Sequence, residues 1–160
     1  MTRKGDHWAV DVTIPALDAR GCGMGLFADL TRGKREPLVL RVPDYMEARP
    51  YGNPVCNGVS TGDTISVKGL TPTVVIPKGK WMSLVLNGQR YLYLVAVDAV
   101  ANGSGVASVQ VTSLLRRPTI DGAAVELAEP KIEGYVPANQ SADIGTLPAV
   151  GLQFSLEERD

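Results

Sequence analysis

The chain has 160 residues, with 16 basic and 17 acidic side chains and a formal net charge of -1. This length allows one continuous hydrophobic core but not two ordinary domains, so a single domain over residues 1–160 is predicted. A nearly neutral chain has no overall attraction to nucleic acid or acidic lipid, so any such contact would need a local patch.

Residues 1–42 are predicted to form a strand, a helix and a second strand. In WAVDVTI, apolar and polar residues alternate as in a half-buried strand, which Pro15 is expected to end. The helix is expected from about Ala16 to Thr31, ending at Gly33. Its apolar stripe would consist of Leu17, Met24, Phe27 and Leu30. Alternation in PLVLRV predicts the second strand, which Pro43 ends.

Residues 43–63 are rich in Pro, Gly and Asn and are predicted to form a long loop. Residues 64–130 are predicted to be β-hairpins. Asn87 and Gly88 stand between WMSLVL and RYLYLVAV, and Asn-Gly between alternating strands is the strongest short hairpin signal. A second hairpin is expected to turn through residues 102–105.

The last third of the chain continues this pattern. Asp121 and Gly122 are predicted to form a turn that leads into a strand. Residues 131–160 are predicted to be an extended C-terminal arm and a closing strand, with one face made by Leu152, Phe154 and Leu156. The predicted fold class is therefore mainly β, an α+β chain with one short helix, built as an antiparallel β-barrel or β-sandwich.

The residue types needed for common catalytic and metal sites are sparse. His7 is the only histidine, so the usual Ser-His-Asp and Cys-His arrangements would all depend on it. Cys22 and Cys56 are too few for a zinc site and are expected to be free thiols, with a disulfide as the alternative. We expect no metal, no cofactor and no enzymatic activity.

Two weaker patterns also favour structural explanations. The glycines of RGCGMG do not lie between a strand and its helix, so the nucleotide-binding fingerprint is not met. Asp44 and Glu47 could form a glycosidase pair, but nothing distinguishes them from solvated loop carboxylates. A small hydrolase is therefore the last of three functional hypotheses.

A carbohydrate-binding β-sandwich is the alternative hypothesis. Trp81, Tyr91 and Tyr93 lie on facing hairpin strands, where exposed rings could stack on a sugar. The competing interpretation places these rings in the core or in a subunit contact.

No targeting segment is evident. No apolar run follows the basic residues near the N-terminus, and the longest apolar runs fall far short of the roughly 20 residues that span a bilayer. We expect no membrane insertion, and a protein that stays in the cytoplasm or leaves it without a secretory signal.

The order of motifs resembles the distal tail protein family, the tail-tip proteins of tailed bacteriophages. The resemblance runs over about Trp8 to Val136, through HWAVDVTIPALDA, FADLTRGKREPLVLRVPD, GNPVCNGVSTGD and the segment from GKWMSLVLNGQ to EPKIEGYV. It includes the LRRPTIDGAAV stretch, which is similar to an LR-x-x-P-x-D-G-A-x-V pattern. The chain departs from the family at KGKW, where Lys80 stands in place of an acidic turn.

This resemblance implies a structural subunit of the virion tail. Such a subunit would form a ring with copies of itself, usually a hexamer, as a tail-tip or adaptor protein between the tail tube protein and the hub or host-recognition proteins. The implied location is the virion tail, and the host cytoplasm during assembly. Passage of DNA through the lumen without specific binding is also implied.

Arg116 and Arg117 are predicted to make subunit contacts with carboxylates of a neighbour. Leu114 and Leu115 are expected to be core residues beside them. Trp81 and Tyr91 are further candidates for the subunit interface. Lining of a DNA channel is the alternative for the two arginines.

Overall fold

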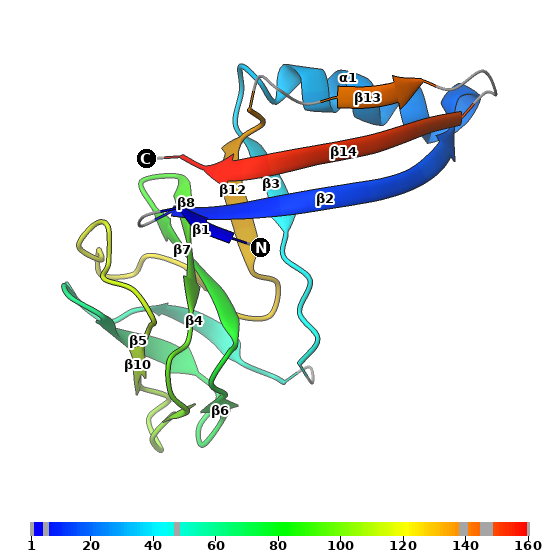
Figure 1. Cartoon of the computed structure of the whole chain (residues 1–160). Helices are drawn as coiled ribbons and strands as arrows, with labels where there is room; N and C mark the ends of the chain where they lie inside the picture. Colours follow the sequence, from blue (N-terminus) through cyan, green and yellow to red (C-terminus); the bar gives the residue numbers. More distant parts are fainter. Residues whose placement is uncertain (1, 5–6, 47–48, 138–140, 145–148, 160) are drawn as a thin grey trace. The chain divides into compact units, whose positions relative to one another are not determined.

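The computed structural model describes residues 2–4, 7–46, 49–137, 141–144 and 149–159 (Figure 1). The chain divides into two compact units, residues 1–39 with 133–160 (unit 1) and residues 40–132 (unit 2). Unit 2 is thus inserted between the two sequence segments of unit 1. The predicted mainly β fold with one short α-helix and antiparallel sheets is confirmed. No helix in the described ranges combines the length and apolar character needed to cross a membrane.

Unit 1 is organised around two long antiparallel strands, β2 (His7–Asp18) and β14 (Ala149–Glu158), which run side by side in Figure 1. The other strands of this sheet are β1 (Thr2–Lys4), β3 (Leu38–Arg41), β12 (Lys131–Tyr135) and β13 (Ser141–Ile144). The order is β1-β2-β14-β12-β3, and β13 also pairs with β14. Strands β3 and β12 carry the chain across the boundary between the units.

The closing strand β14 has the face that the sequence predicts. Its residues Leu152, Phe154 and Leu156 are buried, and Leu156 lies opposite Val10 of β2. Alternation places these side chains on one side of the sheet, where they form an apolar layer. Residues 138–140 and 145–148 of the predicted C-terminal arm lie outside the described residues.

The prediction that Pro15 ends the first strand is wrong. Strand β2 continues to Asp18, and its register with β14 shifts between Leu152 opposite Ile14 and Val150 opposite Leu17. The shift gives β2 one extra residue at this point. A bulge of this kind tolerates a proline, which has no N–H to donate to the ladder.

The predicted helix over residues 16–31 is wrong in its first half. The Asp18 side chain accepts the N–H of Arg20 at the start of a π-helical turn, η1 (Ala19–Gly23), and Gly21 has non-helical dihedrals. Helix α1 (Met24–Arg32) begins only after this glycine-rich turn. The glycines favour the interruption because each of them costs a helix interior about 1 kcal/mol relative to alanine.

The predicted apolar stripe of this helix is only partly realised. Leu30 is the buried residue of α1, whereas Met24 is exposed. Leu17 belongs to β2 rather than to the helix.

Unit 2 consists of short antiparallel strands. They are β4 (Gly52–Cys56), β5 (Thr64–Leu70), β6 (Val75–Ile76), β7 (Trp81–Leu86), β8 (Gln89–Leu94), β9 (Ala99–Val100), β10 (Ala107–Gln110) and β11 (Val125–Glu126). They form sheets of order β10-β5-β4, β11-β7-β8 and β6-β9. Isolated bridges join Val55 to Ala124 and Val95 to Val111.

The Asn87-Gly88 hairpin is confirmed. It joins β7 and β8 in continuous register from Trp81 opposite Leu94 to Leu86 opposite Gln89. Asn87 and Gly88 have φ values of 51° and 80°. Positive φ at both central residues is what a two-residue hairpin turn requires.

The predicted long loop and second hairpin need correction. The loop over residues 43–63 contains β4, which pairs with β5. The turn at residues 102–105 exists, with the Gly105 N–H donating to the carbonyl of Asn102. However, β9 before this turn pairs with β6, and β10 after it pairs with β5. Local turn signals do not determine which distant strand completes each pair.

Candidate interaction surface

Arg116 packs against its own chain. Its guanidinium carbon lies 4.9 Å from the centre of the Tyr91 ring, and its backbone N–H donates to the Tyr93 hydroxyl at 3.2 Å. A cation over an aromatic face contributes about 0.5 to 2 kcal/mol, depending on desolvation. Arg116 is therefore a structural residue of unit 2, and its predicted contact with a neighbouring subunit stays a prediction.

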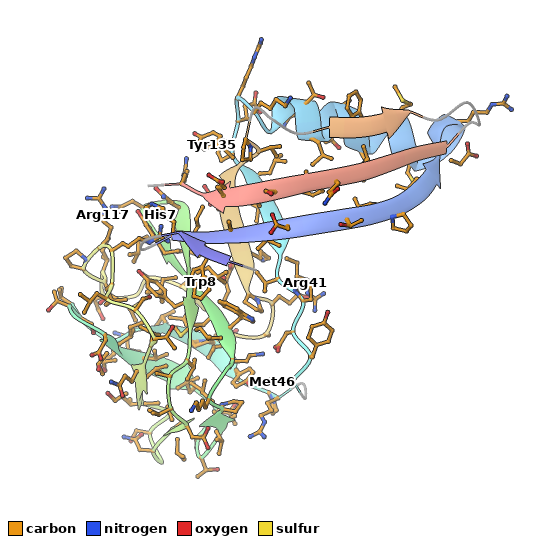
Figure 2. All side chains as sticks on the ribbon, viewed as in Figure 1. His7, Trp8, Arg41, Met46, Arg117 and Tyr135 are labelled. Carbon is orange, nitrogen blue, oxygen red and sulfur yellow. The ribbon has the colours of Figure 1, made fainter. Side chains whose placement is uncertain are left out.

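Arg117 has a different position. It is exposed, and in Figure 2 its labelled side chain extends away from the ribbon. Two residues further along the chain, Thr119 is again buried in unit 2. Of the two adjacent arginines, Arg117 is the one that presents its charge to solvent.

The predicted sugar-binding platform is not formed by the residues proposed for it. Tyr91 and Tyr93 are 5% and 1% exposed, and both belong to the main core of unit 2. Trp81 is half-buried. Because both tyrosine rings are already covered, they offer no face for a sugar, and Tyr91 offers almost none for a second subunit.

Two loops of unit 2, residues 57–62 and 112–122, are bound to each other and are called here the double-loop surface. The Leu115 N–H donates to the Gly62 carbonyl at 2.6 Å, and the Thr119 N–H donates to the Ser60 carbonyl at 3.0 Å. The Thr119 hydroxyl accepts the Ser60 N–H at 2.6 Å and donates to the Gly58 carbonyl at 3.0 Å. These bonds satisfy backbone groups that loops usually leave to water.

The predicted Asp121-Gly122 turn closes one end of this surface. The Ala123 N–H donates to the Ile120 carbonyl, and Gly122 has a φ of 77°. A positive φ at the third position is typical of a type II turn, in which glycine is favoured.

The Asp121 carboxylate fixes both loops. It accepts the Gly58 N–H at 2.8 Å and pairs with the Lys68 ammonium at 2.7 Å. These contacts, with Lys68 first, lower the pKa of Asp121 below its usual range. Because the carboxylate is exposed, the structural value of the pair lies in its position rather than in a large energy.

Apolar side chains project from the double-loop surface. Val59 is 72% exposed and Leu114 is 71% exposed, and Ile120 is exposed as well. Leu114 and Leu115 are both expected in the core, but only Leu115 packs against the core of unit 2. In the sequence these residues are apolar positions with no regular spacing, so no periodic signal identifies them as surface residues.

A groove of about 350 Å³ lies elsewhere in unit 2, between β4 and residues 124–131. The Glu126 carboxylate lines it and is bound by the Arg90 guanidinium at 3.1 Å and the Lys131 ammonium at 3.1 Å. Its oxygens are therefore engaged in ion pairs, which hold β8, β11 and β12 together.

The two cysteines belong to different units. Cys22 is exposed and Cys56 is buried, and both are free thiols, so the alternative of a disulfide is wrong. Burial raises the pKa of the Cys56 thiol to about 11. Within the ranges that the structure describes, no three His, Cys, Asp or Glu side chains gather as a metal site would require.

Comparison with known proteins adds no relative. No protein-family model matches the chain, and no curated protein matches it. The resemblance to distal tail proteins therefore rests on the motifs of the sequence.

Proposed function

We propose that this protein is a structural component of a bacteriophage tail, a ring-forming tail-tip or adaptor subunit. In this role it links the tail tube protein to the hub or to the host-recognition proteins. Copies of the chain bind one another around a lumen through which DNA passes without specific recognition.

The sequence motifs and the fold class support this proposal together. The ordered motifs from Trp8 to Val136 resemble the tail-tip family, and the chain has the mainly β fold that the resemblance implies. Short strands with open edges provide backbone groups that can pair with a neighbour. A net charge of -1 lets identical copies assemble without strong mutual repulsion.

The observation that carries the proposal is the double-loop surface. Its backbone is ordered by internal hydrogen bonds, yet it exposes Val59, Leu114 and Ile120 beside the charge of Arg117. A surface that is already ordered loses little conformational entropy on binding. Apolar side chains surrounded by charged and polar groups are typical of protein contacts, with arginine among the residues that contribute most.

The experiment measures assembly of the purified chain. Native mass spectrometry and negative-stain imaging should reveal a closed ring of one fixed copy number. Leu114→Ser and Ile120→Ser together should weaken assembly by at least tenfold in concentration, because both remove apolar contact area from the same surface. Arg117→Ala should act in the same direction and make assembly less sensitive to salt.

A matched control shows whether loss of assembly is specific to the double-loop surface or follows from the change of any exposed apolar residue. Val100 is an exposed valine on β9, outside the double-loop surface. Val100→Ser should leave the assembly unchanged. A chain that stays monomeric at high concentration, alone and with tail tube protein, would contradict the proposed function. Rings unaffected by the Leu114 and Ile120 changes would instead remove the double-loop surface as the contact.

A further inference from the structure

Lys80 is the most unusual ionisable residue of unit 2. Only 1% of its surface is exposed, although lysine is almost never fully buried without a partner. Its ammonium nitrogen directly contacts Oδ2 of Asp44, whose side chain is 12% exposed. Removing such a pair from water costs each ion several kcal/mol, and mutual attraction often fails to offset this cost. Lys80 and Asp44 are thus an amine and a carboxyl group held in direct contact and largely away from water.

The two groups belong to elements that are far apart in the sequence. Asp44 lies on the connection between β3 and β4, and Lys80 immediately precedes β7. The backbone of Lys80 is fixed because its N–H donates to Pro77 and its carbonyl accepts from Val95. The fold thus brings the Asp44 carboxyl group into contact with an amine whose backbone is held in place.

The surroundings supply further contacts to both groups. The Met46 N–H donates to Oδ1 of Asp44 at 3.1 Å, and Met46 is labelled on this connection in Figure 2. The Tyr51 ring covers the other side, with its centre 5.1 Å from the Lys80 nitrogen. The Tyr51 hydroxyl is buried without a hydrogen-bond partner among the described residues. Burial raises the pKa of this hydroxyl, with the charge of Arg49 opposing the shift and that of Asp44 adding to it.

We propose that the side chains of Lys80 and Asp44 become joined by an intramolecular amide bond, which forms spontaneously in the folded chain. The reaction needs a neutral amine beside a neutral carboxyl group, which the pair gives when one proton passes from the Lys80 ammonium to the Asp44 carboxylate across their direct contact. When two groups are held in contact and well oriented, the effective concentration of one at the other reaches about 10⁵ to 10⁸ M.

The amide bond can form from the atoms of the two side chains alone. The Lys80 nitrogen attacks Cγ of Asp44, and negative charge develops on Oδ1, where the Met46 N–H stabilises it. The bond from Cγ to Oδ2 then breaks, and Oδ2 leaves as water with two protons that originated on the ammonium. An ammonium and a carboxylate thus give one amide and one water molecule, and no oxidant or reductant takes part.

The amide bond would remove two buried charges and fasten the β3–β4 connection to the start of β7. It would close a covalent loop of the same kind as a disulfide, and so restrict the unfolded chain. This inference is independent of the proposed role in a phage tail.

Mass spectrometry of the unfolded protein tests the bond directly. The intact mass should be lower than the sequence mass by one water molecule. Trypsin should fail to cut after Lys80, because an acylated lysine is not a substrate. The digest should contain residues 42–68 linked to residues 79–90, the first peptide being long because Pro50 blocks cleavage after Arg49.

Two variants make the test specific. Asp44→Asn should form the same bond with loss of ammonia, so that its final mass equals that of the wild-type product. Lys80→Arg keeps the positive charge but should retain its full sequence mass. A wild-type chain of unreduced mass that trypsin cuts after Lys80 would overturn the proposal and leave an ordinary buried ion pair.

Discussion

Gly134 of β12 offers a sharp test of how the strands of unit 1 pack. It lies opposite Glu158 of β14, and a Cβ atom built on it would collide with the carbonyl oxygen of Glu157. The same atom would lie 2.5 Å from the Glu157 carbonyl carbon and 2.9 Å from the Glu158 nitrogen, whereas real Cβ atoms essentially never come within 3.0 Å. These are backbone atoms, so no side chain can move aside. Gly134→Ala must therefore push β12 and β14 apart.

The expected cost follows from what this separation breaks. Overpacking costs about 1 to 3 kcal/mol, and each lost backbone hydrogen bond adds about 1 kcal/mol. A total of about 3 kcal/mol corresponds to a fall in melting temperature of roughly 6 to 12 °C for a chain of this size. Thermal unfolding followed by circular dichroism measures the shift, and hydrogen exchange should report faster exchange in β14.

Gly151 of β14 provides the matched control, because a Cβ atom there meets nothing within 4 Å. Gly151→Ala should change the melting temperature by a few degrees at most. Equal melting temperatures for Gly134→Ala and the wild type would refute the reasoning, since they would mean that β12 and β14 are not packed this closely.

Three further predictions concern single residues. Asn87→Ala should cost about 1 to 2 kcal/mol of unfolding free energy, because alanine tolerates a positive φ poorly, whereas Asn87→Gly should cost less in the same denaturation assay. Cys22 should react rapidly with a thiol reagent at pH 8, whereas Cys56 should react only on unfolding. Because the pKa of Cys56 rises from 9.0 to about 11 on folding, its contribution to stability is complete below pH 9. This contribution should be lost as the pH rises to 11. The prediction is wrong if, between pH 9 and 11, the melting temperature of Cys56→Ala falls with pH as steeply as that of the wild type. Asp121→Ala should free the Gly58 N–H and accelerate its hydrogen exchange, while melting changes little.

Local signals in the sequence predict local structure well. The Asn87-Gly88 pair specifies its hairpin because the required dihedrals belong to the two turn residues themselves. The alternation of Leu152, Phe154 and Leu156 likewise specifies a buried face, whichever strand pairs with β14.

Features that depend on distant partners are not predictable in the same way. Proline propensity predicts that the strand ends at Pro15. The strand continues because β2 has one extra residue there opposite β14, and this bulge accommodates the proline. Leu114 has an apolar side chain of the kind found in cores. It is exposed to solvent in a loop that is held by the hydrogen bond between Leu115 and Gly62. Lys80 and Asp44 are 36 residues apart, and only the fold brings them into contact.

The insertion of unit 2 within unit 1 constrains the order in which the chain can fold during synthesis. Residues 40–132 leave the ribosome before β14 exists, so unit 2 can complete its core while β2 still lacks its main partner. Pairing of β2 with β14 must close a loop that contains almost the whole chain, and a prefolded insert shortens the flexible part of that loop. The central strand pair of unit 1 can therefore form only after β14 has been synthesised.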